Sequence, residues 1–284
     1  MRARVMPILA AGLLVVGCGG DPQQSQAPTS PPGKATALSA AAEGDAPDGD
    51  GVMTFTYEDA QSPEAIAGRT LMQDNQLLED LTDDINEGLV LPYDIALLGA
   101  QCDEANAFWD SEEQSITLCY EDAALAQEIF TEAGDPDPDA SALNSEYATF
   151  YHEVGHMAIS IYELPATGRE EDVADQLAAY VLLQPDDDGE PDPESVQAVK
   201  DFARTFGASG DQRVELSPED FADVHSLDET RMFNLQCWIY GSSPDSNGDL
   251  IASGDLPAER ADGCEDEWIL LDRSWSTLLE PYFK

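Results

Sequence analysis

The sequence has few basic residues and no closely spaced pair of cysteines. Its 12 lysines and arginines stand against 58 acidic residues, so the net charge at pH 7 is −46. A chain this negative repels nucleic acid and anionic lipid headgroups, which argues against both as partners. The absence of a Cys-x-x-Cys pair argues against a tetracysteine zinc site.

The N-terminal apolar run is too short and wrongly flanked to span a membrane. Residues 1–18 carry two arginines, then an apolar run that ends in Val-Val-Gly-Cys. This layout is typical of a signal peptide. It resembles a bacterial lipoprotein box, in which Cys18 is lipidated. An ordinary cleaved signal peptide with an incidental cysteine is the alternative. We expect a lipid-anchored protein of the bacterial cell envelope, on its periplasmic or its outer face.

Residues 19–52 are almost free of large apolar side chains and are rich in Pro, Gly, Ser, Ala and Asp. Such a segment cannot bury enough surface to offset the entropy of ordering, which predicts an acidic, disordered tether. The remaining residues, 53–284, are expected to form one domain.

Four cysteines remain after Cys18, and export would place them in an oxidising compartment. Their local spacing suggests disulfides between Cys102 and Cys119 and between Cys237 and Cys264. Four cysteines allow three connectivities, and the sequence alone does not choose among them.

The pattern of apolar residues predicts an α+β domain, mainly helical, with a small sheet and a hairpin. An extended strand is expected over 89–99 and the hairpin over 105–120. Helices are expected over 62–89, 121–134, 143–163, 169–184, 193–206, 217–224, 227–240 and 257–280.

Two of the three histidines lie four residues apart in the motif His-Glu-x-x-His. On a helix, His152 and His156 share one face and can reach one metal ion. Glu153 stands where a general base for a metal-activated water would stand. An exposed helix that carries two histidines by chance is the alternative.

A hydrolytic zinc site needs a third protein ligand and an open position for water. Glu171 and Asp175 stand four residues apart on the next expected helix, beside an apolar face. This spacing predicts Glu171 as the third ligand and Asp175 as the acceptor that fixes a histidine ring. Glu170 adjoins Glu171 and could replace it as the ligand. A solvated acidic face is the alternative.

These motifs resemble the gluzincin group of zinc peptidases, in which the glutamate of Glu-x-x-Ala-Asp is the third ligand. The segment Asn-Ala-Phe-Trp, 106–109, is similar to the edge strand of thermolysin-like enzymes. That resemblance implies that Asn106 and Ala107 hold an extended substrate by β-augmentation. Over about 55–284 the chain resembles a largely uncharacterised bacterial family of metallopeptidases with a zincin-like fold.

The third histidine, His225, follows Asp223 by two residues. In thermolysin-like enzymes a late histidine paired with an aspartate stabilises the oxyanion, and the resemblance implies this role for His225. A histidine near a helix N-terminus is the alternative, and Arg231, Tyr151 and Tyr240 are rivals for the task.

We therefore expect a membrane-anchored enzyme that hydrolyses peptides or proteins with Zn²⁺ as its cofactor. One alternative is a non-catalytic envelope lipoprotein whose metal site is structural or binds without turnover. Another is a zinc hydrolase that cleaves cell-wall amides, because that reaction uses the same activated water. The sequence predicts no substrate preference and no oligomeric state.

Overall fold

The computed structural model describes residues 49–186, 189–212 and 215–284, which lie within one compact unit, Gly44–Lys284. The expected signal peptide, Cys18 and most of the expected tether lie outside these residues. Gly51 already pairs with Leu91, just before the first strand begins. Among the helices of the described part, none is long and apolar enough to cross a membrane.

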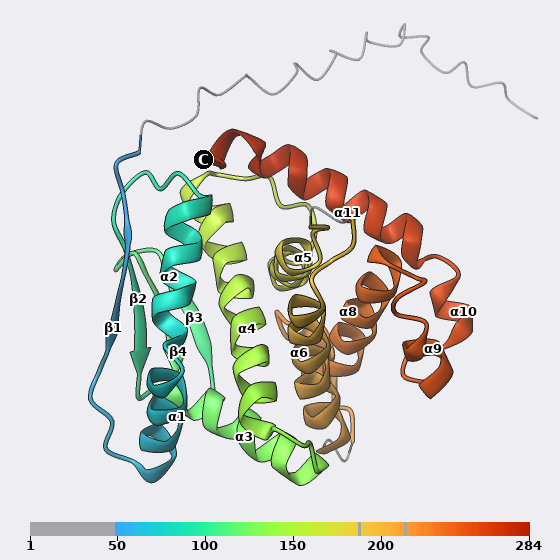
Figure 1. Ribbon diagram of the computed structural model, residues 1–284, viewed down its shortest axis with the longest axis horizontal. Helices are drawn as coiled ribbons and strands as arrows, with labels where there is room; N and C mark the ends of the chain where they lie inside the picture. Colours follow the sequence, from blue (N-terminus) through green and yellow to red (C-terminus); the bar gives the residue numbers. More distant parts are fainter. Residues whose placement is uncertain (1–48, 187–188, 213–214) are drawn as a thin grey trace, which may run out of the picture. The chain divides into compact units, whose positions relative to one another are not determined.

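A mixed sheet of four strands forms one side of this unit (Figure 1). Its strand order is β1-β2-β4-β3; β1, β2 and β4 run parallel, and β3 runs antiparallel to β4. β4 is buried along its whole length, whereas β3 forms an edge of the sheet. The strands are Met53–Tyr57 (β1), Ile95–Ala100 (β2), Ala107–Asp110 (β3) and Ser115–Cys119 (β4).

Most of the described residues are helical. The long helix α4 lies between the sheet and the group formed by α5, α6 and α8 (Figure 1), and it packs against α3, α5, α6 and β3. The helices are Pro63–Asp74 (α1), Leu77–Gly88 (α2), Tyr120–Ala133 (α3), Pro138–Ile161 (α4), Glu170–Leu182 (α5), Pro193–Gln212 (α6), Pro218–Ala222 (α7), Asp228–Ser242 (α8), Asp249–Ser253 (α9), Ala258–Ala261 (α10), Cys264–Leu279 (α11) and a final 3₁₀ turn, Glu280–Tyr282.

The α+β class is confirmed, but several expected elements differ in extent. The single helix expected over 62–89 is wrong, because the chain forms α1 and α2 with a break between them. Gln76 has φ of 56°, a left-handed conformation that no continuous helix contains. The start of α1 is as expected, since Ser62 caps it by accepting a hydrogen bond of 3.0 Å from the backbone N–H of Ala65.

Two other expectations are wrong in detail. The strand expected over 89–99 begins only at Ile95, and its partner β1 was not expected. The helix expected over 257–280 is divided into α10 and α11, and α9 precedes them. The expected hairpin is present as β3 and β4.

Both disulfides are present as the local spacing suggests. Cys102 bonds Cys119, which ties the segment before β3 to the end of β4, and Cys237 bonds Cys264, which ties α8 to α11. They close loops with sequence separations of 17 and 27. Loops of this size stabilise a fold by about 3 kcal/mol each in the chain-entropy account. The second disulfide anchors α8, the helix that carries Arg231.

Candidate metal centre

Three side chains from two helices converge at one point. The Nε2 atoms of His152 and His156, both on α4, lie 3.2 Å apart. One carboxylate oxygen of Glu171, on α5, lies 3.3 Å from each of them. These three ligand atoms lie within 4.8 Å of one another, close enough to bind a single ion. The structure thus brings together the residues that the sequence predicts as ligands.

A close crossing of α4 and α5 makes this convergence possible. A Cβ atom added to Gly155 would lie 2.8 Å from the Cα atom of Ala174 and 3.1 Å from its Cβ atom. Only a residue without a side chain lets the two backbones approach so closely. Near the crossing, α4 also buries the apolar side chains of Phe150, Val154 and Met157 in the core. Packing therefore sets the separation of the candidate ligand side chains.

Each histidine is held by a second carboxylate at its other ring nitrogen. Nδ1 of His152 lies 2.8 Å from Asp175, and Nδ1 of His156 lies 2.9 Å from Glu170. An acceptor at Nδ1 leaves Nε2 free to bind a metal. Glu171 faces both Nε2 atoms, whereas Glu170 lies beside Nδ1 of His156, so the geometry favours Glu171 as the ligand.

Asp175 is itself held by an arginine whose role the sequence did not reveal. Arg231, on α8, donates two hydrogen bonds of 2.7 and 2.6 Å to the two oxygens of Asp175. Its guanidinium also lies over the ring of Phe206, 3.9 Å from the centroid. Basic residues are scarce in this sequence. That scarcity was a hint that an arginine buried in the fold has a specific role.

Electrostatic interactions within the cluster favour the charged forms of His152 and Glu171. Burial alone would lower the pKa of His152, but hydrogen bonds to Asp175 and Glu171 raise that pKa to about 9. Burial would raise the pKa of Glu171, yet its contacts with His152 and His156 hold that pKa far below the usual range. A metal ion would replace protons at the same nitrogens, because ligation requires neutral imidazole.

Glu153 lies beside the cluster without joining it. Its side chain is buried, and burial raises the pKa of its carboxyl above the usual value for glutamate. The backbone of Trp109, in the edge strand β3, hydrogen-bonds to this carboxylate. A carboxylate with a raised pKa is well suited to accept and return a proton near neutral pH.

The edge strand faces the same cavity as the metal centre. Asn106 and Ala107 both line that cavity, as the resemblance implies for residues that hold a substrate. The side chain of Asn106 accepts a hydrogen bond of 3.0 Å from the backbone N–H of Ala107. β3 pairs with β4 on one side and forms an edge of the sheet on the other. On that edge the backbone N–H of Ala107 bonds Asn106, and the backbone of Trp109 bonds Glu153.

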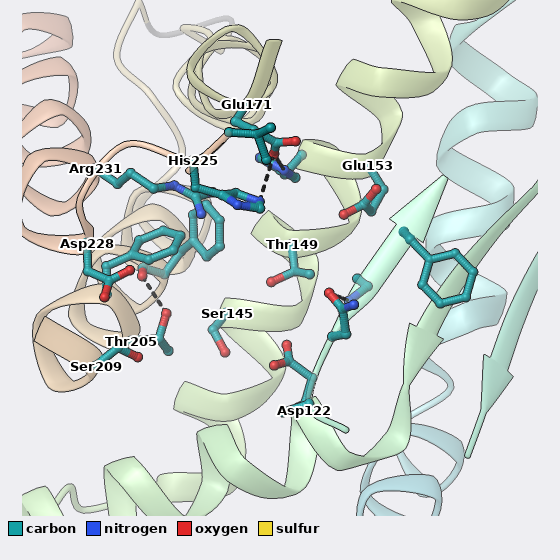
Figure 2. Close-up of a pocket in the computed structure, with 18 of the residues that line it drawn as sticks. Asp122, Ser145, Thr149, Glu153, Glu171, Thr205, Ser209, His225, Asp228 and Arg231 are labelled. Atoms are coloured by element: carbon teal, nitrogen blue, oxygen red, sulfur yellow. Dashed lines mark hydrogen bonds and ion pairs between the residues drawn. The ribbon is translucent and has the colours of Figure 1, made fainter. Parts of the chain in front are cut away.

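His225 reaches the cluster from the loop before α8. Its Nε2 lies 3.2 Å from the carboxylate of Glu171 (Figure 2). Its Nδ1 lies 2.9 Å from Asp223. Arg169, next to the ligand helix, holds this loop by donating to the backbone carbonyls of Asp223 and His225. The rivals Tyr151 and Tyr240 are not among the described residues that line the cavity, whereas Arg231 is.

A cavity of about 900 Å³ opens beside these groups. Its walls come from the start of β3, from α3, α4 and α6, and from the loop that carries His225. Figure 2 shows Glu171 and His225 at one end, Asp122 at the other, and Thr149 and Ser145 between them. The space is large enough for several residues of an extended peptide.

Comparison with known proteins gives one match. Residues 57–279 fit the model of a protein family described as "Putative metallopeptidase". No curated protein and no solved structure matches the chain. The matched range contains the helix pair, the edge strand and the loop of His225.

Proposed function

Because the chain belongs to this metallopeptidase family, we propose that it is a zinc-dependent peptidase with a zincin-like fold. One observation carries the proposal: three donor atoms from His152, His156 and Glu171 meet beside a buried glutamate that is not one of them. A purely structural metal site has no use for Glu153 at that place. Hydrolysis of a cell-wall amide would use the same groups and would differ from proteolysis only in its substrate.

The donor set fits zinc. Two imidazole nitrogens and one carboxylate oxygen are a known ligand set of hydrolytic zinc sites, which keep a further position open. The second nitrogen of each histidine is already engaged by a carboxylate, as is usual for such ligands. Two imidazole nitrogens in a set of three converging donors make calcium or magnesium, which prefer oxygen ligands throughout, a poorer fit.

A bound zinc ion would supply a Lewis acid that makes water a nucleophile near neutral pH. In the proposed reaction Glu153 takes a proton from that water as the water attacks the substrate carbonyl, and later gives the proton to the leaving amine. The imidazolium form of His225, with Nδ1 held by Asp223, would donate a hydrogen bond from Nε2 to the oxyanion that develops. Asn106 and Ala107 hold the substrate backbone along β3.

The experiment that tests this function combines metal analysis with hydrolysis. We expect the purified full-length chain, kept in detergent, to bind one zinc ion and to cleave β-casein, an unfolded protein substrate. Removal of zinc by a chelator should abolish cleavage, and added zinc should restore it. A chain that holds no zinc after zinc is supplied, or that holds zinc and cleaves neither casein nor peptidoglycan amides, would contradict the proposal.

We also propose that the enzyme is anchored to the bacterial envelope through a lipid on Cys18. The layout of residues 1–18 supports this location, and two disulfides fit an oxidising compartment outside the cytoplasm. Mass spectrometry of the mature N-terminal peptide is expected to show a lipidated Cys18. An unmodified N-terminus that begins elsewhere would show an ordinary secreted protein.

A further inference from the structure

The cavity extends well past the metal centre along one face of α4. Ser145, Thr149 and His152 all line it, and their spacing of three or four residues places them in one row. The seven residue steps from Ser145 to His152 correspond to about 10 Å along the helix axis. The cavity therefore has room for a long side chain that points away from the scissile bond.

A single carboxylate stands at the far end of this row. Asp122, near the start of α3, lines the cavity, and Figure 2 shows its carboxylate beside Ser145. The walls of the cavity combine the hydroxyl groups of Ser145 and Thr149 with apolar side chains, which include Leu125, Ala126, Ile129, Phe202 and Phe206. Apolar surface beside a charge at the end suits a side chain with an apolar stem and a charged tip.

A second carboxyl lies directly behind Asp122. Glu146, on α4, has no exposed surface, and within the described part of the chain neither of its oxygens receives a hydrogen bond from an N–H or O–H group. It meets the carboxyl of Asp122 instead, and burial raises the pKa of both groups. Two buried carboxyls without a cation are costly for a fold, since apolar side chains would pack there at less expense.

The arginines that line the cavity are engaged elsewhere. Arg231 is bound to Asp175, and Arg169 is bound to the backbone of the His225 loop. Other charged side chains of the lining, among them Glu170 and Asp223, add negative potential. A cation that enters the cavity would be attracted throughout and would find an uncompensated carboxylate at the end.

We propose that Asp122, backed by Glu146, forms a pocket that binds the basic side chain of a substrate residue next to the scissile bond. This inference rests on the proposed peptidase function and names its substrate class: peptides that contain lysine or arginine. Ser145, beside Asp122, lies about 10 Å along the helix axis from His152. A lysine side chain that extends about 6 Å from its Cα atom, together with about 3.5 Å for one residue of extended substrate backbone, spans a similar distance. A free peptide N-terminus lacks that reach.

The test compares acetylated, amidated heptapeptides of alanine that differ only in a central lysine, norleucine or glutamate. We expect the wild-type enzyme to cleave the lysine peptide with a kcat/KM at least about tenfold above that of the norleucine peptide, because a hydrogen bond between charged groups contributes that much. In Asp122→Asn this ratio should fall by about tenfold. Glu128→Gln removes a charge from the exposed face of the same helix and should leave the ratio unchanged.

A ratio near one in the wild-type enzyme, or an unchanged ratio in Asp122→Asn, would overturn the inference. Binding of the same peptides to Glu153→Gln, measured by calorimetry, separates this inference from the proposed function. A lysine preference in binding, together with no hydrolysis of any of the peptides by the wild-type enzyme, would support the pocket and contradict the peptidase. Hydrolysis without any preference would contradict the pocket alone. If Asp122→Asn fails to fold, the ratio of kcat/KM between the lysine and norleucine peptides in the wild-type enzyme still tests the pocket.

Discussion

Replacing Glu153 with glutamine should leave one zinc ion bound per chain and reduce kcat/KM by about a thousandfold. Glutamine has nearly the same shape as glutamate but cannot take a proton from water, and a positioned general base contributes roughly 10²–10⁴-fold. Zinc should remain because Glu153 is not one of the three converging ligands. Zinc content and casein hydrolysis, measured on the same preparation, check both halves of the prediction.

Two further variants serve as comparisons for Glu153→Gln. Glu128→Gln changes an exposed carboxylate of α3 and should behave like the parent. His225→Ala should also keep its zinc and lose about tenfold to a hundredfold in kcat, since removing one oxyanion donor typically costs up to 10²–10³-fold. Hydrolysis by Glu153→Gln at more than a tenth of the parent rate would show that another group is the base.

Replacing Glu171 with alanine should weaken zinc binding by more than about a hundredfold and abolish hydrolysis. Even the carboxylates that support ligating histidines typically contribute 10–100-fold to metal affinity, so a direct ligand should contribute more. The carboxylate of Glu171 lies within 3.3 Å of the Nε2 atoms of both His152 and His156. A competition titration against a chelating dye measures the loss.

Glu170→Ala is the matched comparison, because it removes the adjacent carboxylate from the same turn of α5. Glu170 contacts only the outer nitrogen of His156, so its loss should weaken zinc binding by about 10–100-fold and no more. If Glu170→Ala lost zinc while Glu171→Ala retained it, the ligand would be Glu170, and the assignment made from the geometry would be wrong.

Local spacing in the sequence was enough to predict which side chains converge at the candidate metal centre. Residues four apart on a helix share a face in any fold, so His152 with His156, and Glu171 with Asp175, could be paired without coordinates. The hairpin and both cysteine pairings are also local features. They depend on segments that lie near one another in the chain.

The parts that sequence reasoning missed depend on distant contacts. The pairing of Asp122 with Glu146, and of Arg231 with Asp175, joins helices whose relative position no spacing encodes. The segment Met53–Tyr57 becomes the strand β1 because β2 pairs with it. The sequence of this short segment by itself gives little indication of a strand. The break at Gln76 was missed because no glycine or proline marks it.

The contact at Gly155 has a consequence for which metals the protein accepts. Zinc binds nitrogen and oxygen at about 2.0–2.2 Å, whereas calcium prefers about 2.3–2.6 Å. Since the backbones of α4 and α5 meet at Gly155 and Ala174, the gap between the ligands is set by a residue that binds nothing. A methyl group at 155 would push α4 and α5 apart and move the two histidines away from Glu171. The fit of an ion to this site would then depend on helix packing as well as on ligand chemistry.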